Sequence, residues 1–144
     1  MLHVSNGSLQ WNTVVESTEK EPNQYGSLRD KQDMKGRYDL LPNSIFKRLA
    51  LRAESGAKKY AERNWEKGQP LSQYYNSAMR HLLAIQDADL SEDHYAAAIW
   101  NIAAMMHHID KMLTNELPVE LDSFGIIARI NQELIFQTLK EYSP

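Results

Sequence analysis

Apolar residues recur at every third or fourth position through most of the chain from residue 43 onwards. This spacing places them along one side of an α-helix, and it predicts four helices. The first covers residues 43–63, the second begins near Ser72, the third near Ser91 and the last at Asp122 or Ser123. The third shows the clearest periodicity, at Tyr95, Ala98, Ile99, Ile102, Met105, Met106, Ile109 and Leu113.

Capping and breaking residues define the expected ends of these helices. The candidate N-caps are Asn43 or Ser44, then Ser72 and Ser91, since their side chains can accept a hydrogen bond from a free backbone N–H. Gly68 and Pro118 lie in the expected breaks. No stretch alternates with period two for long enough to predict a substantial sheet. The fold class is therefore all-α, with about four helices in a compact antiparallel bundle joined by short connections.

The first part of the chain has a different pattern. Residues 1–34 are polar, without sustained periodicity, and only residues 9–15 favour a short strand or hairpin arm. Low apolar content is typical of segments that form no core. We therefore expect a flexible, poorly structured extension over residues 1–26 and one helical domain over residues 27–144.

Composition narrows the classes of function. The chain has 144 residues, enough for one domain, with 42% hydrophobic and 24% charged residues. Its net charge of −3 argues against a nucleic-acid partner, which favours basic surfaces. The absence of cysteine excludes thiolate chemistry and fits a reducing cytoplasm. No apolar run approaches a membrane span, so we expect a soluble cytoplasmic protein without a membrane partner.

The predicted third helix is rich in alanine and methionine. Alanine permits close helix approach, and methionine fills irregular gaps. This helix is therefore a candidate for a subunit interface or the central helix of the bundle, while an ordinary buried helix has the same composition.

Three segments combine charged and aromatic residues. They are KGRYDLLP at residues 35–42, ESGAKKYAERNWEKG at residues 54–68, and SEDH at residues 91–94, followed by Trp100 and Asn101. Carboxylates there can hold Mg²⁺, and lysine and arginine can neutralise phosphates. The aromatic rings offer stacking faces for a base. His81 and His94 can orient a carboxylate, bind a metal or exchange a proton.

Each of these residues also has a structural interpretation. Glu54 and Lys58 are spaced as a surface ion pair. Glu92 and Asp93 at a helix start interact favourably with the helix dipole. Trp100 at helical spacing is compatible with a core position. The two histidines His107 and His108 near the end of this helix are interpreted as structural residues.

At these segments the chain resembles a known family. SLRD at residues 27–30, KGRYDLLP, ESGAKKYAERNWEKGQPLSQYYNSAMRHL at residues 54–82 and SEDHYAAAIWN at residues 91–101 occur in the order seen in the N-terminal domain of phage-encoded dATP/dGTP diphosphohydrolases. The similarity spans roughly residues 27–113. That family is similar to the all-α, MazG-like nucleotide pyrophosphohydrolases.

The resemblance implies hydrolysis of dATP or dGTP to the monophosphate and pyrophosphate, with Mg²⁺ or Mn²⁺ as cofactor, adjusting the purine deoxynucleotide pool of an infected cell. The catalytic candidates are Glu54, Asp93 and His94, and the metal-ligand candidates are Glu54, Glu92 and Asp93. The substrate-binding candidates are Lys35, Arg37, Lys59, Tyr60, Arg63, Asn64, Trp65, Lys67, Arg80, His81 and Asn101. MazG-like relatives usually assemble as dimers or tetramers, which implies a homo-oligomer.

The chain departs from the MazG-like metal motif. Such enzymes pair ExxE on one helix with ExxD on a later one, but this chain has no ExxD, and its one ExxE lies at residues 16–19. A rearranged set of carboxylates is then required for catalysis. The alternative is a non-catalytic helical module that binds a nucleotide or a host factor.

Overall fold

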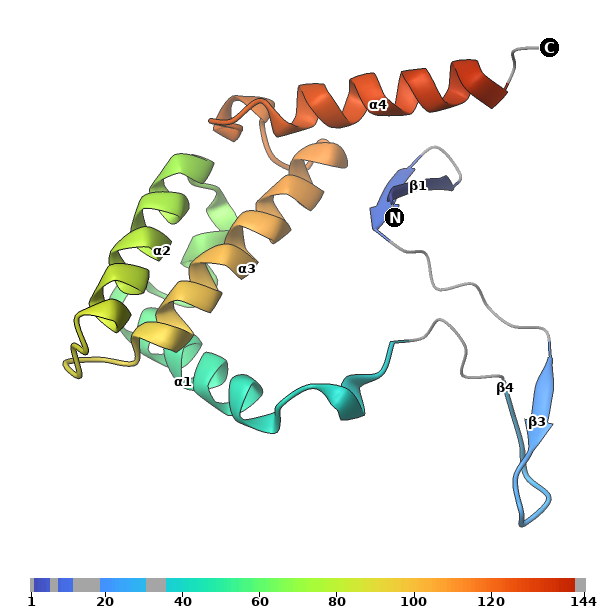
Figure 1. Ribbon diagram of the computed structural model, residues 1–144, viewed down its shortest axis with the longest axis horizontal. Helices are drawn as coiled ribbons and strands as arrows, with labels where there is room; N and C mark the ends of the chain where they lie inside the picture. The colour runs from blue at the N-terminus through green and yellow to red at the C-terminus, as the bar shows by residue number, and fades with distance from the viewer. Residues whose placement is uncertain (1, 6–7, 12–18, 31–35, 142–144) are drawn as a thin grey trace. The chain divides into compact units, whose positions relative to one another are not determined.

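The computed structural model describes residues 2–5, 8–11, 19–30 and 36–141, with side chains for residues 19–29 and 36–135. The chain divides into two compact units, Met1–Pro42 and Asn43–Pro144. The second unit holds four helices, α1 (Asn43–Tyr60), α2 (Leu71–Gln86), α3 (His94–Leu113) and α4 (Ile126–Glu141) (Figure 1). The predicted all-α, four-helix fold is confirmed. Among the described residues, no helix is both long and apolar enough to cross a membrane.

The first unit contains two antiparallel hairpins and a short 3₁₀ turn at Tyr38–Leu40. Strand β1 (Leu2–Ser5) pairs with β2 (Ser8–Trp11), and β3 (Lys20–Pro22) pairs with β4 (Leu28–Asp30). The strand expected over residues 9–15 thus ends at Trp11, and residues 12–15 lie outside the described part of the chain. The flexibility of residues 1–26 and a domain boundary at residue 27 stay predictions.

Helices α2 and α3 lie side by side and run in opposite directions (Figure 1). Small side chains are buried on both helices, namely Ala78 of α2 and Ala97 and Ala104 of α3. Alanine has no side chain beyond Cβ, so two helix backbones can approach closely while remaining well packed. Helix α1 contacts α3 from a second side, and α4 contacts α3 as well.

The predicted apolar stripe of α3 is divided between the core and the surface. Ile99, Ile102 and Met106 are 39%, 45% and 62% exposed. Met105, Ile109 and Leu113 pack against the apolar core. The buried face carries alanines together with His94, Asn101 and His108.

The main apolar core lies where α2 begins, α3 ends and α4 begins. It is centred on the buried side chains of Leu71, Met112 and Ile127. Partly buried side chains pack around them, namely Met105, Ile109, Leu113, Leu117, Leu121 and Ile126. This core joins α4 to the α2–α3 pair at the end opposite to the loop that connects α2 to α3.

Two expected helix starts are displaced. Helix α2 begins at Leu71 after Pro70, which cannot donate a backbone hydrogen bond, and the hydroxyl of Ser72 instead lies 3.1 Å from that of Ser123. Helix α4 begins at Ile126, where the carboxylate of Asp122 accepts a hydrogen bond from the N–H of Ile127 at 2.8 Å.

The end of α1 and the start of α3 also differ from expectation. Helix α1 ends at Tyr60, three residues early, because Ala61 adopts a left-handed backbone with φ of +85°. Helix α3 begins at His94, and its N-cap is Asp93, rather than Ser91, because the Asp93 carboxylate accepts from the N–H of Ala96 at 3.0 Å.

Two glycines provide a matched test of this packing. Gly68 has φ of +94°, and a Cβ there would lie 2.8 Å from Cδ1 of Leu121. We expect Gly68→Ala to lower the free energy of unfolding by about 1–3 kcal/mol through backbone strain and crowding. Gly56 is helical and nothing lies within 4 Å of its Cβ position. Gly56→Ala should be neutral or stabilise by up to about 1 kcal/mol. Urea unfolding of both variants measures these changes, and equal effects would contradict this account.

Candidate functional site

A cavity of about 920 Å³ lies within the helical unit, against α1, α2, the segment between them and the first half of α3. Its lining is mainly polar and aromatic. The lining residues are Arg52, Ala53, Ser55, Gly56, Ala57, Lys59, Tyr60, Ala61, Asn64, Trp65, Gln69, Gln73, Tyr74, Asn76, Ser77, Arg80, His81, Glu92, Trp100 and Asn101.

Helical periodicity positions two polar stripes on the cavity wall. On α1, Arg52 and Lys59 are seven residues apart, two turns of the same face. On α2, Gln73, Asn76 and Arg80 follow at spacings of three and four. Each helix therefore directs a polar stripe at the cavity and packs against the rest of the unit with its other positions.

The cavity carries an excess of positive charge. Arg52, Lys59 and Arg80 line it, against the single carboxylate of Glu92, whose Oε2 lies 2.5 Å from Nη1 of Arg52. Among residues 19–29 and 36–135, neither Lys59 nor Arg80 forms an ion pair. Two cations are thus left to attract an anionic ligand.

Aromatic rings form another part of the wall. Trp65 and Trp100 meet edge to face with ring centroids 5.5 Å apart, and Trp65 also lies 4.9 Å from the ring of His107. Tyr74 donates its hydroxyl to the carbonyl of Trp65 at 3.3 Å, and burial raises its pKa to about 12. Tyr60 is 60% exposed, and Nζ of Lys59 lies over its ring, 5.0 Å from the centroid. The aromatic ring and the cation are therefore presented together.

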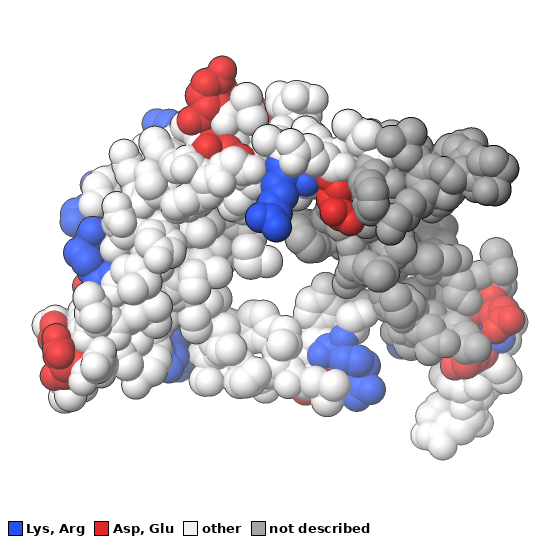
Figure 2. Space-filling model, turned by 45° about the horizontal axis from the view of Figure 1, so that its top comes forward, with Lys and Arg blue, Asp and Glu red and all other residues white. Residues whose placement is uncertain are grey.

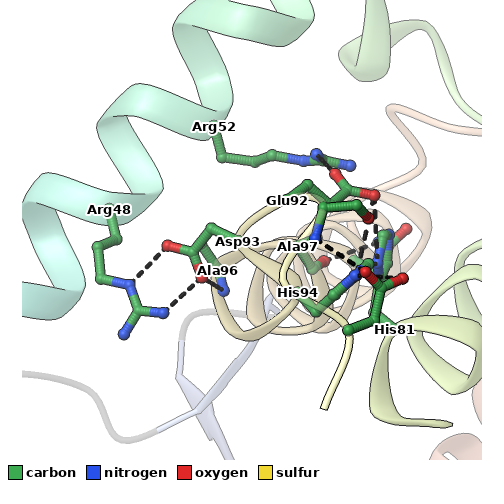
Figure 3. A network of polar contacts seen from close by, with 11 residues as sticks. Arg48, Arg52, His81, Glu92, Asp93, His94, Ala96 and Ala97 are labelled. Atoms are coloured by element: carbon green, nitrogen blue, oxygen red, sulfur yellow. Dashed lines mark hydrogen bonds and ion pairs between the residues drawn. The ribbon is translucent and has the colours of Figure 1, made fainter. Parts of the chain in front are cut away.

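A cluster of His81, Glu92 and His94 lies at the edge of this cavity (Figure 3). The Nδ1 atoms of the two histidines face each other at 3.0 Å, and Oε1 of Glu92 lies 3.8 Å from each. His94 is only 6% exposed, and its Nε2 lies 3.2 Å from Oδ2 of Asp89. The three groups offer one oxygen and two nitrogen atoms that can hold a metal ion.

The local environment alters the pKa of one member of the cluster, His81, and of one neighbour, Asp89. Burial lowers the pKa of His81, which favours its neutral form at neutral pH. The pKa of Asp89 is lowered chiefly by hydrogen bonding from Ser91, whose N–H donates to Oδ1 of Asp89 at 2.8 Å. Asp89 is therefore a fixed negative charge beside His94.

The three predicted metal-binding carboxylates are not assembled into one group. Glu54 accepts from Lys58 at 2.6 Å. Glu92 pairs with Arg52, and Asp93 pairs with Arg48 (Figure 3). Each carboxylate thus faces a different cation of α1. Glu92 is the one member of the predicted set that also belongs to the His81–Glu92–His94 cluster.

The sequence model of the dATP/dGTP diphosphohydrolase N-terminal family matches residues 25–116. The chain belongs to this family. The matched region includes every residue that lines the cavity and ends before α4. At the level of the family, the match supports a hydrolase. No curated protein and no solved structure matches the chain. The relation to MazG-like enzymes stays a prediction.

Seven of the predicted substrate-binding residues come together in the cavity of this family member. They are Lys59, Tyr60, Asn64, Trp65, Arg80, His81 and Asn101. Asn101 is buried, and its side-chain amide donates to the carbonyl of Ala97 at 2.8 Å. These assignments as substrate contacts stay predictions.

The other four predicted residues are not among the described residues that line the cavity. Arg37 belongs to the first unit and pairs with Asp39 at 2.7 Å, and Arg63 pairs with Glu66 at 2.8 Å. Lys67 is exposed and does not line it. Lys35 lies outside the described residues.

Sequence reasoning missed several cavity residues. Arg52, Gln73 and Asn76 line the wall but lie outside the three charged and aromatic segments. Their helical spacing from Lys59 and Arg80 was the available signal, because residues three, four or seven apart share one face of a helix. Asp89 was missed because it lies in the loop before the SEDH segment.

The cap at Asp93 generates a prediction about pH. Arg48 and then the N–H of Ala96 lower the pKa of Asp93 to about 2, below its value of about 3.9 in an unfolded chain. The stabilisation is fully present above about pH 4 and is lost as the pH falls towards 2. We expect Asp93→Asn to lower the free energy of unfolding by about 1 kcal/mol at pH 6 and by less at pH 2.5.

Urea unfolding at both pH values measures this difference. Arg48→Gln is the matched control, since it removes the ion pair and keeps the cap. If Asp93→Asn lowers the free energy of unfolding equally at both pH values, the ionised Asp93 carboxylate is not the source of the stabilisation.

Proposed function

We propose that this chain hydrolyses dATP or dGTP to the deoxynucleoside monophosphate and pyrophosphate. The observation that carries the proposal is the cavity, which combines Lys59 and Arg80, two cations without an ion pair among the described side chains, with aromatic rings inside the matched family region. Its volume lies within the usual range for small-molecule sites. In an infected cell, the reaction in the cytoplasm would adjust the purine deoxynucleotide pool.

The distribution of charge supports a triphosphate ligand. Lys59 and Arg80 approach the cavity from α1 and α2, so a polyanion between the two helices would meet a cation from each. Arginine can donate two parallel hydrogen bonds to a phosphate, and lysine acts as a point charge. Tyr60 supplies an exposed ring for the base, and the amides of the wall supply donors and acceptors.

The wall at Gly56 supports close approach of a ligand to α1. A glycine in the middle of a helix costs stability relative to alanine, and here no protein atom occupies the space beside it. The open volume next to the backbone is available to a ligand between Arg52 and Lys59.

The reaction follows from these groups. A water oxygen bonds to the α-phosphorus, the bond from that phosphorus to the bridging oxygen breaks, pyrophosphate leaves, and a proton passes to solvent. Lys59 and Arg80 offset the charge of the phosphates. A divalent ion, Mg²⁺ or Mn²⁺, would supply electrostatic stabilisation of the phosphates and an acidified water. Glu92, His81 and His94 are described residues whose donor atoms lie close enough together to hold a divalent ion, and their two nitrogens fit Mn²⁺ better than Mg²⁺.

Pyrophosphate release from each of the four dNTPs, with Mg²⁺ and with Mn²⁺, tests the proposal. We expect release from dATP or dGTP and none from the pyrimidine substrates. Lys59→Ala should lower kcat/KM by about ten- to a hundredfold, because it removes a charged contact to phosphate.

Lys58 provides the matched control for Lys59. It is the preceding residue, pairs with Glu54 and does not line the cavity. Lys58→Ala should therefore keep activity within about twofold, since an exposed pair contributes little. Equal loss in the two variants would count against the cavity as the substrate site.

One observation favours a second function, a non-catalytic module that binds a nucleotide. Each of Glu54, Glu92 and Asp93 is already paired with a cation, which reduces the charge available for a catalytic ion. Nucleotide binding by calorimetry, without pyrophosphate release under any metal, would establish this alternative.

We further propose that the chain is a homo-oligomer that associates through the exposed face of α3, defined as Tyr95, Ile99, Ile102 and Met106. These residues recur at spacings of three and four and are 39–62% exposed. Contiguous apolar surface of this kind is typical of an interface. In the view of Figure 2, broad areas of the described surface carry no charged side chain, which is compatible with self-association.

Sedimentation tests the interface. We expect a species of at least twice the 16.6 kDa chain mass at micromolar concentration. Ile102→Asp should shift it to the monomer, because a charge in an apolar contact remains unpaired. Leu90→Asp is the control, since Leu90 is 93% exposed in the loop before α3 and lies off this face. A wild-type monomer at high micromolar concentration would overturn the proposal.

A further inference from the structure

We propose that His81, Glu92 and His94 form a binding centre for a first-row transition-metal ion, and that Asp89 positions His94 within it. The centre is selective for ions that accept nitrogen ligands, so Mg²⁺ is not its preferred occupant. A role of this ion in hydrolysis rests on the proposed function, whereas the binding of the metal does not.

The distances between the donor atoms permit one shared ion. Two ligands that are each about 2.1 Å from a metal cannot be more than about 4.2 Å apart, and they are about 3.0 Å apart when they subtend a right angle. The two Nδ1 atoms are separated by 3.0 Å, and Oε1 of Glu92 lies 3.8 Å from both. All three separations fall within the limit, and the two nitrogens match adjacent positions of an octahedral ion.

Asp89 completes an arrangement that is typical of metal-bound histidine. A histidine that binds a metal through one ring nitrogen usually directs the other at a carboxylate, which fixes the tautomer and the ring orientation. Nε2 of His94 is buried and lies 3.2 Å from Oδ2 of Asp89, a close contact without the geometry of a hydrogen bond, while Nδ1 lies 3.0 Å from Nδ1 of His81. Asp89 is itself held by the N–H of Ser91. Asp89 therefore lies at the nitrogen of His94 that does not face the centre, where binding of a metal at Nδ1 would let Nε2–H donate to it.

The contact between His81 and His94 is largely shielded from water. His94 is 6% exposed, and the side chain of His81 is 13% exposed. Two imidazoles with facing nitrogens can share one proton as a hydrogen bond, but that contact alone does not require two neighbouring carboxylates. An ion between the nitrogens would satisfy both of them and the inward oxygen of Glu92. Arg52 contacts the other oxygen of Glu92 and leaves Oε1 directed at the histidines.

The donor set determines which ions bind. Imidazole nitrogen favours later first-row ions, and the affinity of such sites rises from Mn²⁺ through Co²⁺ to Ni²⁺. Mg²⁺ strongly prefers oxygen ligands and retains its waters. Two nitrogens and one carboxylate oxygen therefore favour Co²⁺ and Mn²⁺ over Mg²⁺. His81 and Glu92 also line the cavity, so phosphate oxygens could occupy the remaining ligand positions.

Calorimetry of the full chain with Co²⁺, without nucleotide, tests the centre, and the visible absorption of bound Co²⁺ is a second readout. We expect one ion per chain and at least tenfold weaker binding of Mg²⁺. His81→Gln, Glu92→Gln and His94→Gln should each abolish Co²⁺ binding. Asp89→Asn should weaken it by about ten- to a hundredfold. His107→Gln, a histidine outside the cluster, should leave it unchanged.

Circular dichroism of each variant separates loss of the site from loss of the fold. His81→Gln is the decisive variant, because replacing the less buried histidine disturbs the fold less. Co²⁺ binding that persists in a folded His81→Gln variant, or that is absent from the wild type, would overturn the centre. Pyrophosphate release decides the proposed function separately: a chain that binds Co²⁺ but releases no pyrophosphate retains the centre and loses the activity.

Discussion

The close packing of α2 against α3 through alanine side chains is the interaction on which the rest of the molecule depends. Ala78, Ala97 and Ala104 are buried in or beside this contact, and they bring two backbones near each other. His81 on α2 and His94 at the start of α3 consequently meet at 3.0 Å. The same arrangement leaves Tyr95, Ile99, Ile102 and Met106 of α3 partly exposed. One contact therefore produces both the candidate metal centre and the apolar face assigned to self-association.

Helix α1 is held in a different way. It has no buried residue, and its contacts with the start of α3 include two ion pairs, from Arg48 to Asp93 and from Arg52 to Glu92. Partly exposed pairs of this kind each contribute about 0–1 kcal/mol. Helix α1 nevertheless supplies one wall of the cavity, including Lys59. We therefore expect its position to depend on what fills the cavity more than the positions of α2 and α3 do.

Much of the fold could be predicted because helix formation is governed by neighbours in the chain. Apolar periodicity, Gly68 and Pro118 together indicated four helices in the order found. The face of α3 that is buried could not be predicted in this way. Its helix carries a stripe of large apolar residues and a stripe of alanines, and periodicity alone favours the large residues. Only the partner helix decides between them, because its distance sets the side-chain volume that fits.

The same division applies to the candidate site. The sequence alone determined the family, the helices and the types of residue near the site, since these depend on residue identity and on local spacing. The tertiary structure decided which groups meet. In the folded chain Glu54 pairs with Lys58, Asp93 caps α3, and Glu92 lies beside His81 and His94. Spacing along a helix predicts neighbours on that helix, whereas contacts between helices depend on crossing geometry, which no single segment encodes.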